Sequence, residues 1–454
     1  MPMRRIFITS LLSLSVLWNL NGQGDTRWTL KECIRYAIQY NLDVKRQELI
    51  LQSTDRDLLQ SKMDLLPNLN GAIEHQLGSG RVLDRGTYEW KNASVSQGDM
   101  GLQSDLTIFN GLQGLNNMKM NRASHMMSRE DLEAMEDQIT LGVMTGYLDL
   151  LRNNELVEVA EHKVEVTRSQ VERMEQLVEV GNEARGKLLE VNAQLSSAKL
   201  SLTRAINARE IARLNLMHMM NLTGETTFEI DEPGLPDPAL VEIPSLDTVF
   251  RKAMAILPQI KSAEYGIETM ERQLALQQGK RSPRVFARGL YYTNYSDGLI
   301  NPRDPDPVNP TLDYALPTQL QDNQYRQVSM GIQFPIFNRW QVQTGINKAR
   351  IELQDAEYRY QSAVLDLQKS IQQYHTEAVA AMDNYRSALE SVASNEEVFR
   401  FAEERFRVGT GTALEMQEAR NQLYEATSEM VSSKYVLIFY VKILDFYMGK
   451  EIAF

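Results

Sequence analysis

The tripeptide Ile108-Phe109-Asn110 recurs as Ile336-Phe337-Asn338, 228 positions further along a chain of 454 residues. At that same offset, Val180-Gly181 recurs as Val408-Gly409. Nearer the N-terminus, three further residues recur at an offset of 216: Leu30 as Leu246, Ala37 as Ala253 and Pro67 as Pro283. A duplicated unit of about 200 residues is far longer than one solenoid repeat, so the sequence predicts two copies of one structural half.

The two predicted halves have the same order of elements, namely a helix, two strands and then very long helices. The first repeat spans 23–230 and the second spans 246–454. Between them, residues 231–245 contain four prolines, which helix interiors and central strands both exclude. This segment is therefore predicted to be a linker.

The first 22 residues have the pattern of a signal peptide. Arg4 and Arg5 precede an apolar stretch, Ile6–Leu20, which is too short to span a bilayer comfortably. No cysteine follows that stretch at a lipidation position, and the one cysteine, Cys33, lies on the apolar side of a predicted helix. We therefore expect an exported protein without an N-terminal lipid, in which Cys33 is a small core residue.

The net charge is −12, and removal of the predicted signal peptide, which carries two arginines and no acid, makes it −14. Such a surface repels phosphate backbones, so nucleic acid is not expected as a partner. Beyond the signal peptide, no segment is apolar for long enough to predict a transmembrane helix. An exported chain of this kind is either water-soluble or enters an outer membrane as a β-barrel.

Three segments alternate between apolar and polar residues, as strands with two unlike faces do: 69–77, 102–108 and 330–336. A fourth candidate strand, 283–295, alternates less regularly but is rich in aromatic residues. Such runs are typical of barrel strands with lipid outside and water inside, and a half-buried hairpin of a soluble domain has the same alternation. A polar loop, 79–94, is predicted between the first two segments. The second loop, 296–323, contains five prolines, so neither helix nor central strand is expected there.

Asn117–Val180 and Trp340–Val408 contain no proline and predict helices of 64 and 69 residues, the former roughly 95 Å long. Shorter helices are predicted at 45–66, 187–222, 260–282 and 412–448. In each half the two short lengths add up to nearly the long one, so we expect them to stack end to end beside it. Part of the second long helix has the apolar spacing of a coiled-coil seam: Ile346, Ala349, Leu353, Ala356, Tyr360, Ala363 and Leu367.

Taken in order, these features resemble the TolC-like outer-membrane efflux and secretion channels. The resemblance covers the mature chain and is carried by the opening Trp28–Ala37, the Ile-Phe-Asn segments, the Val-Gly turns and Arg407–Ala419. It implies a mainly α-helical fold with membrane β-strands. In that fold a homotrimer shares one 12-stranded β-barrel, surrounded by outer-membrane lipid, which continues into a periplasmic coiled-coil α-barrel.

Elementary physics also requires several copies if the strands lie in a membrane. Four strands cannot close around a pore, and open edges in lipid leave unpaired backbone groups that each cost several kcal/mol. Three copies is the number that the resemblance implies, whereas the residues themselves allow two or four as well.

The resemblance places functional residues at the turns between the long helices. Glu415 and Glu418 are three apart on one helix face and match the carboxylates that line the pore constriction in this family. Three copies would gather six carboxylates, which attract cations, whereas a solvated helix face is the simpler alternative. The turns are the expected docking surface for a periplasmic adaptor, or they are only helix caps: Val180, Gly181, Val408, Gly409 and Thr410.

No catalytic residue, cofactor site or metal site is predicted. The five histidines show no metal-ligand spacing such as His-Glu-x-x-His, and neither a Gly-rich phosphate loop nor a Gly-x-Ser-x-Gly elbow is present. Met217-His218-Met219-Met220 contains soft-metal ligands, but methionines on a helix more often fill a packing interface. We therefore do not expect an enzyme.

These observations predict a passive outer-membrane duct with a long periplasmic extension. An inner-membrane transporter and a periplasmic adaptor, or membrane fusion protein, would deliver its substrates. Drug efflux, metal efflux and type I protein secretion all fit, because a wide duct does not encode its cargo in short motifs. The alternative is an exported coiled-coil scaffold or adhesin without a pore.

Overall fold

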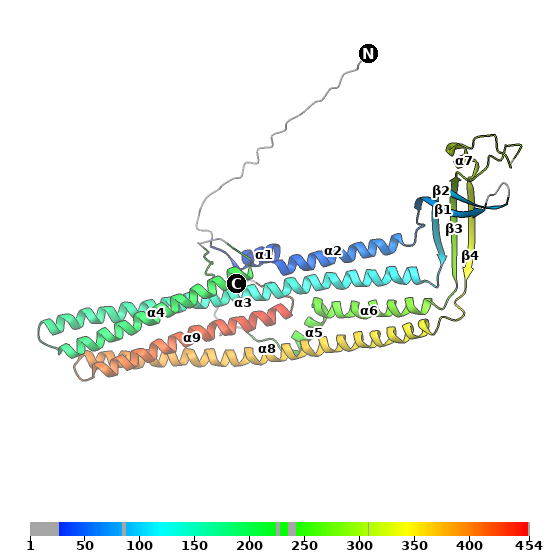
Figure 1. Ribbon diagram of the computed structural model, residues 1–454. Coiled ribbons are helices and arrows are strands. Elements are labelled where there is room, and N and C mark those ends of the chain that lie inside the picture. Colours follow the sequence, from blue (N-terminus) through cyan, green and yellow to red (C-terminus); the bar gives the residue numbers. More distant parts are fainter. Residues whose placement is uncertain (1–26, 84–87, 224–227, 235–241, 307, 453–454) are drawn as a thin grey trace, which may run out of the picture.

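The structure, a computed structural model, describes residues 27–83, 88–223, 228–234, 242–306 and 308–452. The predicted signal peptide, residues 1–22, lies outside them. In the described part of the chain, a long rod of helices lying side by side carries a four-stranded sheet at one end (Figure 1).

The main elements occur in the same order twice. The first series is α1 (Leu30–Tyr40), α2 (Leu42–Met63), β1 (Asn70–Leu83), β2 (Trp90–Phe109), α3 (Gln113–Glu179) and α4 (Arg185–Met219). The second series is α5 (Leu246–Ile256), α6 (Pro258–Gly279), β3 (Arg284–Ser296), β4 (Tyr325–Gln333), α8 (Gln341–Arg407) and α9 (Ala413–Tyr447), and α7 (Leu316–Asp322) lies between its strands. Equivalent helices have equal lengths: α1 and α5 have 11 residues, α2 and α6 have 22, α3 and α8 have 67, and α4 and α9 have 35.

The predicted stacking of short helices along a long one is confirmed in both halves. α2 and α4 follow one another along α3, and α6 and α9 follow one another along α8 (Figure 1). α3 also packs against α6 and α9, which joins the halves. α2 begins three residues before the predicted position because Asn41 is an N-cap, whose Oδ1 accepts a hydrogen bond of 2.8 Å from the Asp43 amide.

Apolar side chains fill the spaces between these helices. On α8, Ile346, Ala349 and Leu367 of the predicted seam are buried, and the seam residues between them are half-buried. Cys33 of α1 is fully buried in a cluster that includes Met220 of the α4 C-cap. Its burial raises the pKa of the thiol to about 12, so the thiol stays protonated and acts as a small apolar group.

The sheet is antiparallel, with strands in the order β1-β2-β3-β4. The loop predicted at 79–94 is wrong over most of its length, because β1 continues to Leu83, which pairs with Trp90 of β2. Short polar side chains do not oppose strand pairing where both faces meet water, so polarity alone was misleading. β4 ends at Gln333 instead of 336, because Pro335 has no amide hydrogen to donate to a ladder.

The connection between β3 and β4 contains α7, although its prolines predicted no helix there. Pro317 lies in the first turn of α7, where an amide hydrogen has no helical acceptor in any case. Two hydrogen bonds hold α7 against β3. The Ser296 amide donates to Gln319 Oε1 at 2.8 Å, and Thr293 Oγ1 donates to the Leu320 carbonyl at 2.7 Å.

The repeated Ile-Phe-Asn segments lie where the sheet gives way to the long helices. In the first, Gly111 and Leu112 have positive φ angles of 68° and 62°, and in the second Arg339 and Trp340 have 52° and 66°. A Cβ on Gly111 would lie 2.3 Å from the Gly279 carbonyl oxygen, so the first junction requires glycine. The repeated sequence thus accompanies a repeated left-handed turn from sheet to rod.

Candidate functional site

The predicted tip residues form two turns at the end of the rod far from the sheet (Figure 1). Val180 and Gly181 follow α3, and Val408, Gly409 and Thr410 follow α8. The two glycines have φ angles of 77° and 78°, in the left-handed region that favours glycine. A Cβ on either would meet open space, so backbone conformation and not crowding explains the residue type.

Both turns have the paired hydrogen bonds of a Schellman motif. The Gly181 amide donates to the Val178 carbonyl at 3.1 Å, and the next amide donates to the Leu177 carbonyl at 2.8 Å. Gly409 and the amide after it repeat these bonds at 3.1 and 2.9 Å. The valine before each glycine is exposed, so the two tips offer the same backbone shape and the same apolar side chain.

The two predicted constriction carboxylates have different surroundings. Glu415 completes a capping box at the start of α9, because its amide donates to Thr412 Oγ1 at 3.1 Å and the Thr412 amide donates to Glu415 Oε2 at 3.2 Å. The same Oε2 lies 3.6 Å from Arg405 Nη2 across the turn. Glu418, one helical turn further on, is exposed, and its carboxylate has neither a hydrogen bond nor an ion pair within the described ranges.

Sequence reasoning missed the capping role of Glu415, although Thr-x-x-Glu at 412–415 is the signature of a capping box. It also missed Arg420, which is buried between α8 and α9 with its guanidinium 5.8 Å from the centre of the Phe399 ring. Arg420 Nη2 donates to Gln417 Oε1 at 3.1 Å, while Nε and Nη1 have no hydrogen-bond partner among the described residues. Burial lowers the pKa of this guanidinium. No sequence signal marks such a residue, since arginines in helices are usually exposed.

At the other end of the rod, the sheet has the two unlike faces that the alternation predicted. Ile73 and Met330 lie on the apolar face, where they are 80% and 72% exposed. On the opposite face, Arg288 Nε donates to Asp105 Oδ1 at 2.6 Å, and the Tyr292 hydroxyl donates to Asp99 Oδ1. An exposed apolar face backed by a hydrogen-bonded polar face suits a sheet between lipid and water.

Neither a metal centre nor a membrane-spanning helix is found in the described residues. No group of three or more His, Cys, Asp or Glu side chains there is arranged to hold a metal ion. Met217 and Met220, from the methionine-rich segment, are buried in the helical core. None of the described helices is both long and apolar enough to cross a membrane.

The rod and its amphipathic sheet define the class of the protein, since this is the fold of the TolC-like outer-membrane channels. The outer membrane protein VceC of Vibrio cholerae has a TM-score of 0.74 and 15% identity over 93% of this chain and 96% of its own. The open-state outer membrane channel MtrE of Neisseria gonorrhoeae has a TM-score of 0.73 and 16% identity, over 93% and 89%. The Campylobacter jejuni outer membrane channel CmeC has the same TM-score and identity, over 92% and 85%.

The chain belongs to the outer membrane efflux protein family, whose pattern matches residues 33–222 and 249–438. The outer membrane efflux protein BepC of Brucella suis biovar 1 (strain 1330) is 20% identical over 427 residues, which cover 92% of this chain and 85% of BepC. The family consists of outer-membrane efflux channels and not of enzymes, and its match favours the channel over the scaffold or adhesin.

Proposed function

We propose that three copies of this chain form one efflux duct, in which their sheets join into a 12-stranded β-barrel and their rods into a periplasmic α-helical tunnel. The free sheet edges are the observation that carries this proposal. β1 and β4 end the strand order, and each has one edge without a partner strand in the described chain. Because unpaired backbone groups in lipid cost several kcal/mol each, β1 of one copy pairs with β4 of the next.

The outer side of the rod supports the same assembly. Ile351, Tyr358 and Leu365 of α8 are spaced seven residues apart and are 67%, 58% and 64% exposed. α2 has a matching exposed pair, Leu42 and Leu49, at the same spacing. Spacing of seven places side chains on one line of a helix, as coiled-coil partners require. α8 of one copy therefore packs against α2 of the next, and the repeated contact closes a ring.

The function follows from this architecture. The duct allows substrates to leave passively across the outer membrane. α3 and α8, each roughly 100 Å long, extend its channel into the periplasm. An inner-membrane transporter supplies the substrate and the energy, and a periplasmic adaptor docks at the exposed turns around Gly181 and Gly409. Glu415 and Glu418 of three copies narrow the entrance and favour cations. The two halves, 23–230 and 246–454, joined by 231–245, are products of one duplication.

The proposal is tested on the chain purified from outer membranes in detergent. We expect a trimer that survives gel electrophoresis unheated and dissociates on boiling, and that conducts ions in planar bilayers. Tyr358→Lys should weaken the trimer, since it places a charge in the α8–α2 contact. Glu352→Lys is the control, because Glu352 lies six residues before Tyr358 and therefore about 120° away from it around the axis of α8. A monomer without conductance would refute the proposal.

A further inference from the structure

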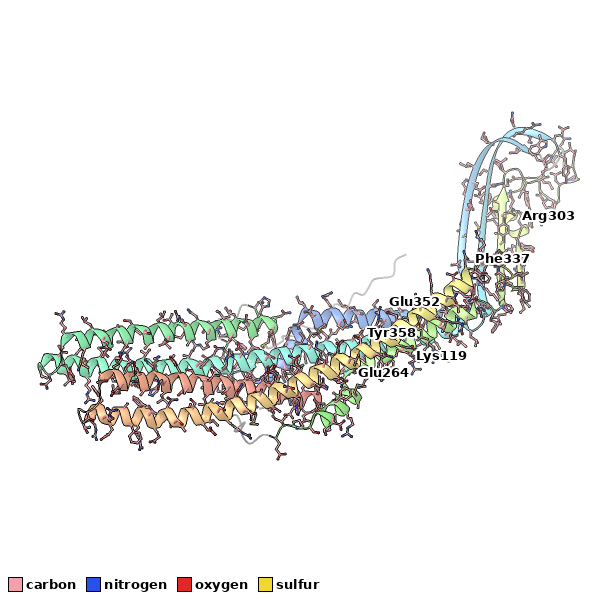
Figure 2. The ribbon with its side chains drawn as sticks, turned by 90° about the horizontal axis from the view of Figure 1, so that it is seen from below. Lys119, Glu264, Arg303, Phe337, Glu352 and Tyr358 are labelled. Atoms are coloured by element: carbon pink, nitrogen blue, oxygen red, sulfur yellow. The ribbon has the colours of Figure 1, made fainter. Side chains whose placement is uncertain are left out.

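Exposed apolar and basic side chains gather where the sheet meets the rod, and the efflux pathway gives them no role. Figure 2 shows Phe337 at this level. All members of the group are exposed. We call the group the junction collar: the apolar Phe109, Leu112, Phe337 and Trp340 and the basic Lys280, Arg281 and Arg339.

The fold brings these residues together from three separate segments. The end of α6 lies against the first Ile-Phe-Asn junction, because a Cβ on Gly279 would lie 2.4 Å from the Gly111 carbonyl oxygen. The end of α6 also reaches the second junction, because Arg281 Nη2 donates to Gln343 Oε1, in the first turn of α8, at 2.5 Å. Lys280 and Arg281 therefore lie between the two aromatic junctions.

The charge at this level is opposite to that of the rest of the chain. The segments 59–69, 105–122, 276–292 and 334–350 contain ten Lys or Arg and two Asp or Glu, whereas the whole chain has a net charge of −12. Two of the ten belong to the polar face of the sheet, where Arg284 donates to Thr107 and Arg288 to Asp105. The other eight are exposed, and three of them belong to the collar.

We propose that the junction collar binds the anionic phospholipid headgroups of the inner leaflet of the outer membrane. This inference rests on the proposed function, which places the sheet in that membrane. Beyond the end of β4 the chain presents the exposed Phe337 and Trp340, whose rings suit the boundary between acyl chains and headgroups. The guanidinium and ammonium groups beside them lie at headgroup level, where each basic residue strengthens binding to an anionic surface by about fivefold.

Charge complementarity selects lipid over a second copy of the chain. At the same level, the end of α2 and the start of α3 present Lys62 and Lys119, both exposed. In the proposed trimer α2 of the next copy lies beside α8, and its end, with the exposed Lys62 and Asp64, brings no net negative charge that would neutralise the collar. An anionic bilayer surface provides acyl chains that the apolar residues of the collar contact and negative charges that its basic residues bind.

The test uses Trp340 as a reporter in the full chain reconstituted in nanodiscs. Apart from Trp18 in the predicted signal peptide, the tryptophans are Trp28, Trp90 and Trp340, so Trp28→Phe with Trp90→Phe leaves one emitter in the mature chain. Phosphatidylglycerol or phosphatidylcholine, brominated on the acyl chain near the headgroup, is added as a minor component. We expect brominated phosphatidylglycerol to quench Trp340 at least about twice as strongly as brominated phosphatidylcholine.

Charge variants distinguish headgroup binding from simple proximity to lipid. Lys280→Gln/Arg281→Gln/Arg339→Gln should abolish the preference while quenching by both lipids persists. The control, Lys199→Gln/Arg204→Gln/Lys252→Gln, removes three exposed charges elsewhere and should keep the stronger quenching by brominated phosphatidylglycerol. Absence of quenching in an inserted trimer, or equal quenching by the two lipids, would overturn the collar assignment alone. A chain that does not enter the nanodisc would overturn the proposed function as well.

Discussion

Arg405 and Glu415 meet across the α8–α9 turn, with 3.6 Å between Arg405 Nη2 and Glu415 Oε2. The two side chains are 58% and 50% exposed, so their ion pair contributes on the order of 0.5 kcal/mol. The capping box that the same carboxylate completes contributes about 1 kcal/mol. Glu415 therefore holds the turn together whatever its role in a pore, whereas Glu418 has no such structural role.

Substitutions of Glu415 and Glu418 distinguish the roles of the two carboxylates. Glu418→Gln should lower the cation selectivity of the channel in planar bilayers and leave amide exchange in the first turn of α9 unchanged. Glu415→Ala should speed that exchange about fivefold, because it loses the cap. Glu415→Gln should keep the cap, since glutamine also serves in a capping box. Unchanged cation selectivity in Glu415→Gln/Glu418→Gln would remove the carboxylate ring from the proposed function.

The tip glycines give a second prediction. Gly181→Ala and Gly409→Ala should each destabilise their turn by about 1 kcal/mol, because alanine at a φ near 77° or 78° is strained. Hydrogen exchange at the amides after each glycine reports the loss. Gly186→Ala is the matched control, since this glycine lies within α4 with open space around it and should be neutral or stabilising. Equal effects at all three positions would contradict this reading of the tips.

Much of the fold could be predicted because it is encoded locally and twice. The helix lengths follow from proline-free stretches between Gly-containing turns such as Gly181 and Gly409. The faces of the sheet follow from the alternation in three of its four strands. The outer part of the β1–β2 hairpin was missed because it lies beyond any core, where polar composition does not distinguish strand from loop. α7 was missed because proline in a first helical turn cannot be told from proline in a loop by composition.

The candidate site was less predictable for a different physical reason. The tip residues were found through the Val-Gly turns, which are local signals. The partners of Glu415 depend on how the turn folds back. The ion pair between Arg405 and Glu415, ten positions apart, could therefore not be predicted from the sequence. Arg420 is buried only because α8 and α9 close around it, and no local pattern reports that.

Asp137 of α3 gives a pH-dependent prediction. Burial, with smaller effects of Glu133 and Glu136, raises its pKa to about 6. The folded state then binds a proton that the unfolded state releases near pH 4, so stability falls as pH rises from about 4 to 6. Asp137→Asn should raise the free energy of unfolding at pH 7 by on the order of 2 kcal/mol and change it little at pH 4.

The measurement is thermal unfolding of Asp137→Asn and the parent protein at pH 4 and pH 7, followed by helical circular dichroism. Glu161→Gln, at an exposed position of the same helix, is the control and should shift the melting temperature equally at both pH values. If Asp137→Asn raises the melting temperature equally at pH 4 and pH 7, removal of the Asp137 charge is not the cause of the stabilisation.

Arg420 gives the last prediction, because two of its guanidinium nitrogens are buried without a hydrogen-bond partner in the described chain. Arg420→Met keeps most of the packing on Phe399 and removes the unpaired groups, so it should leave the melting temperature unchanged or raise it. Arg420→Ala loses the packing as well and should destabilise by about 2 kcal/mol. Arg400→Met, at an exposed position of α8, should change stability by less than about 0.5 kcal/mol. If Arg420→Met lowers stability as much as Arg420→Ala does, the prediction is contradicted. The guanidinium group would then form a hydrogen bond or ion pair in the assembled channel, and this bond would explain why the arginine is buried.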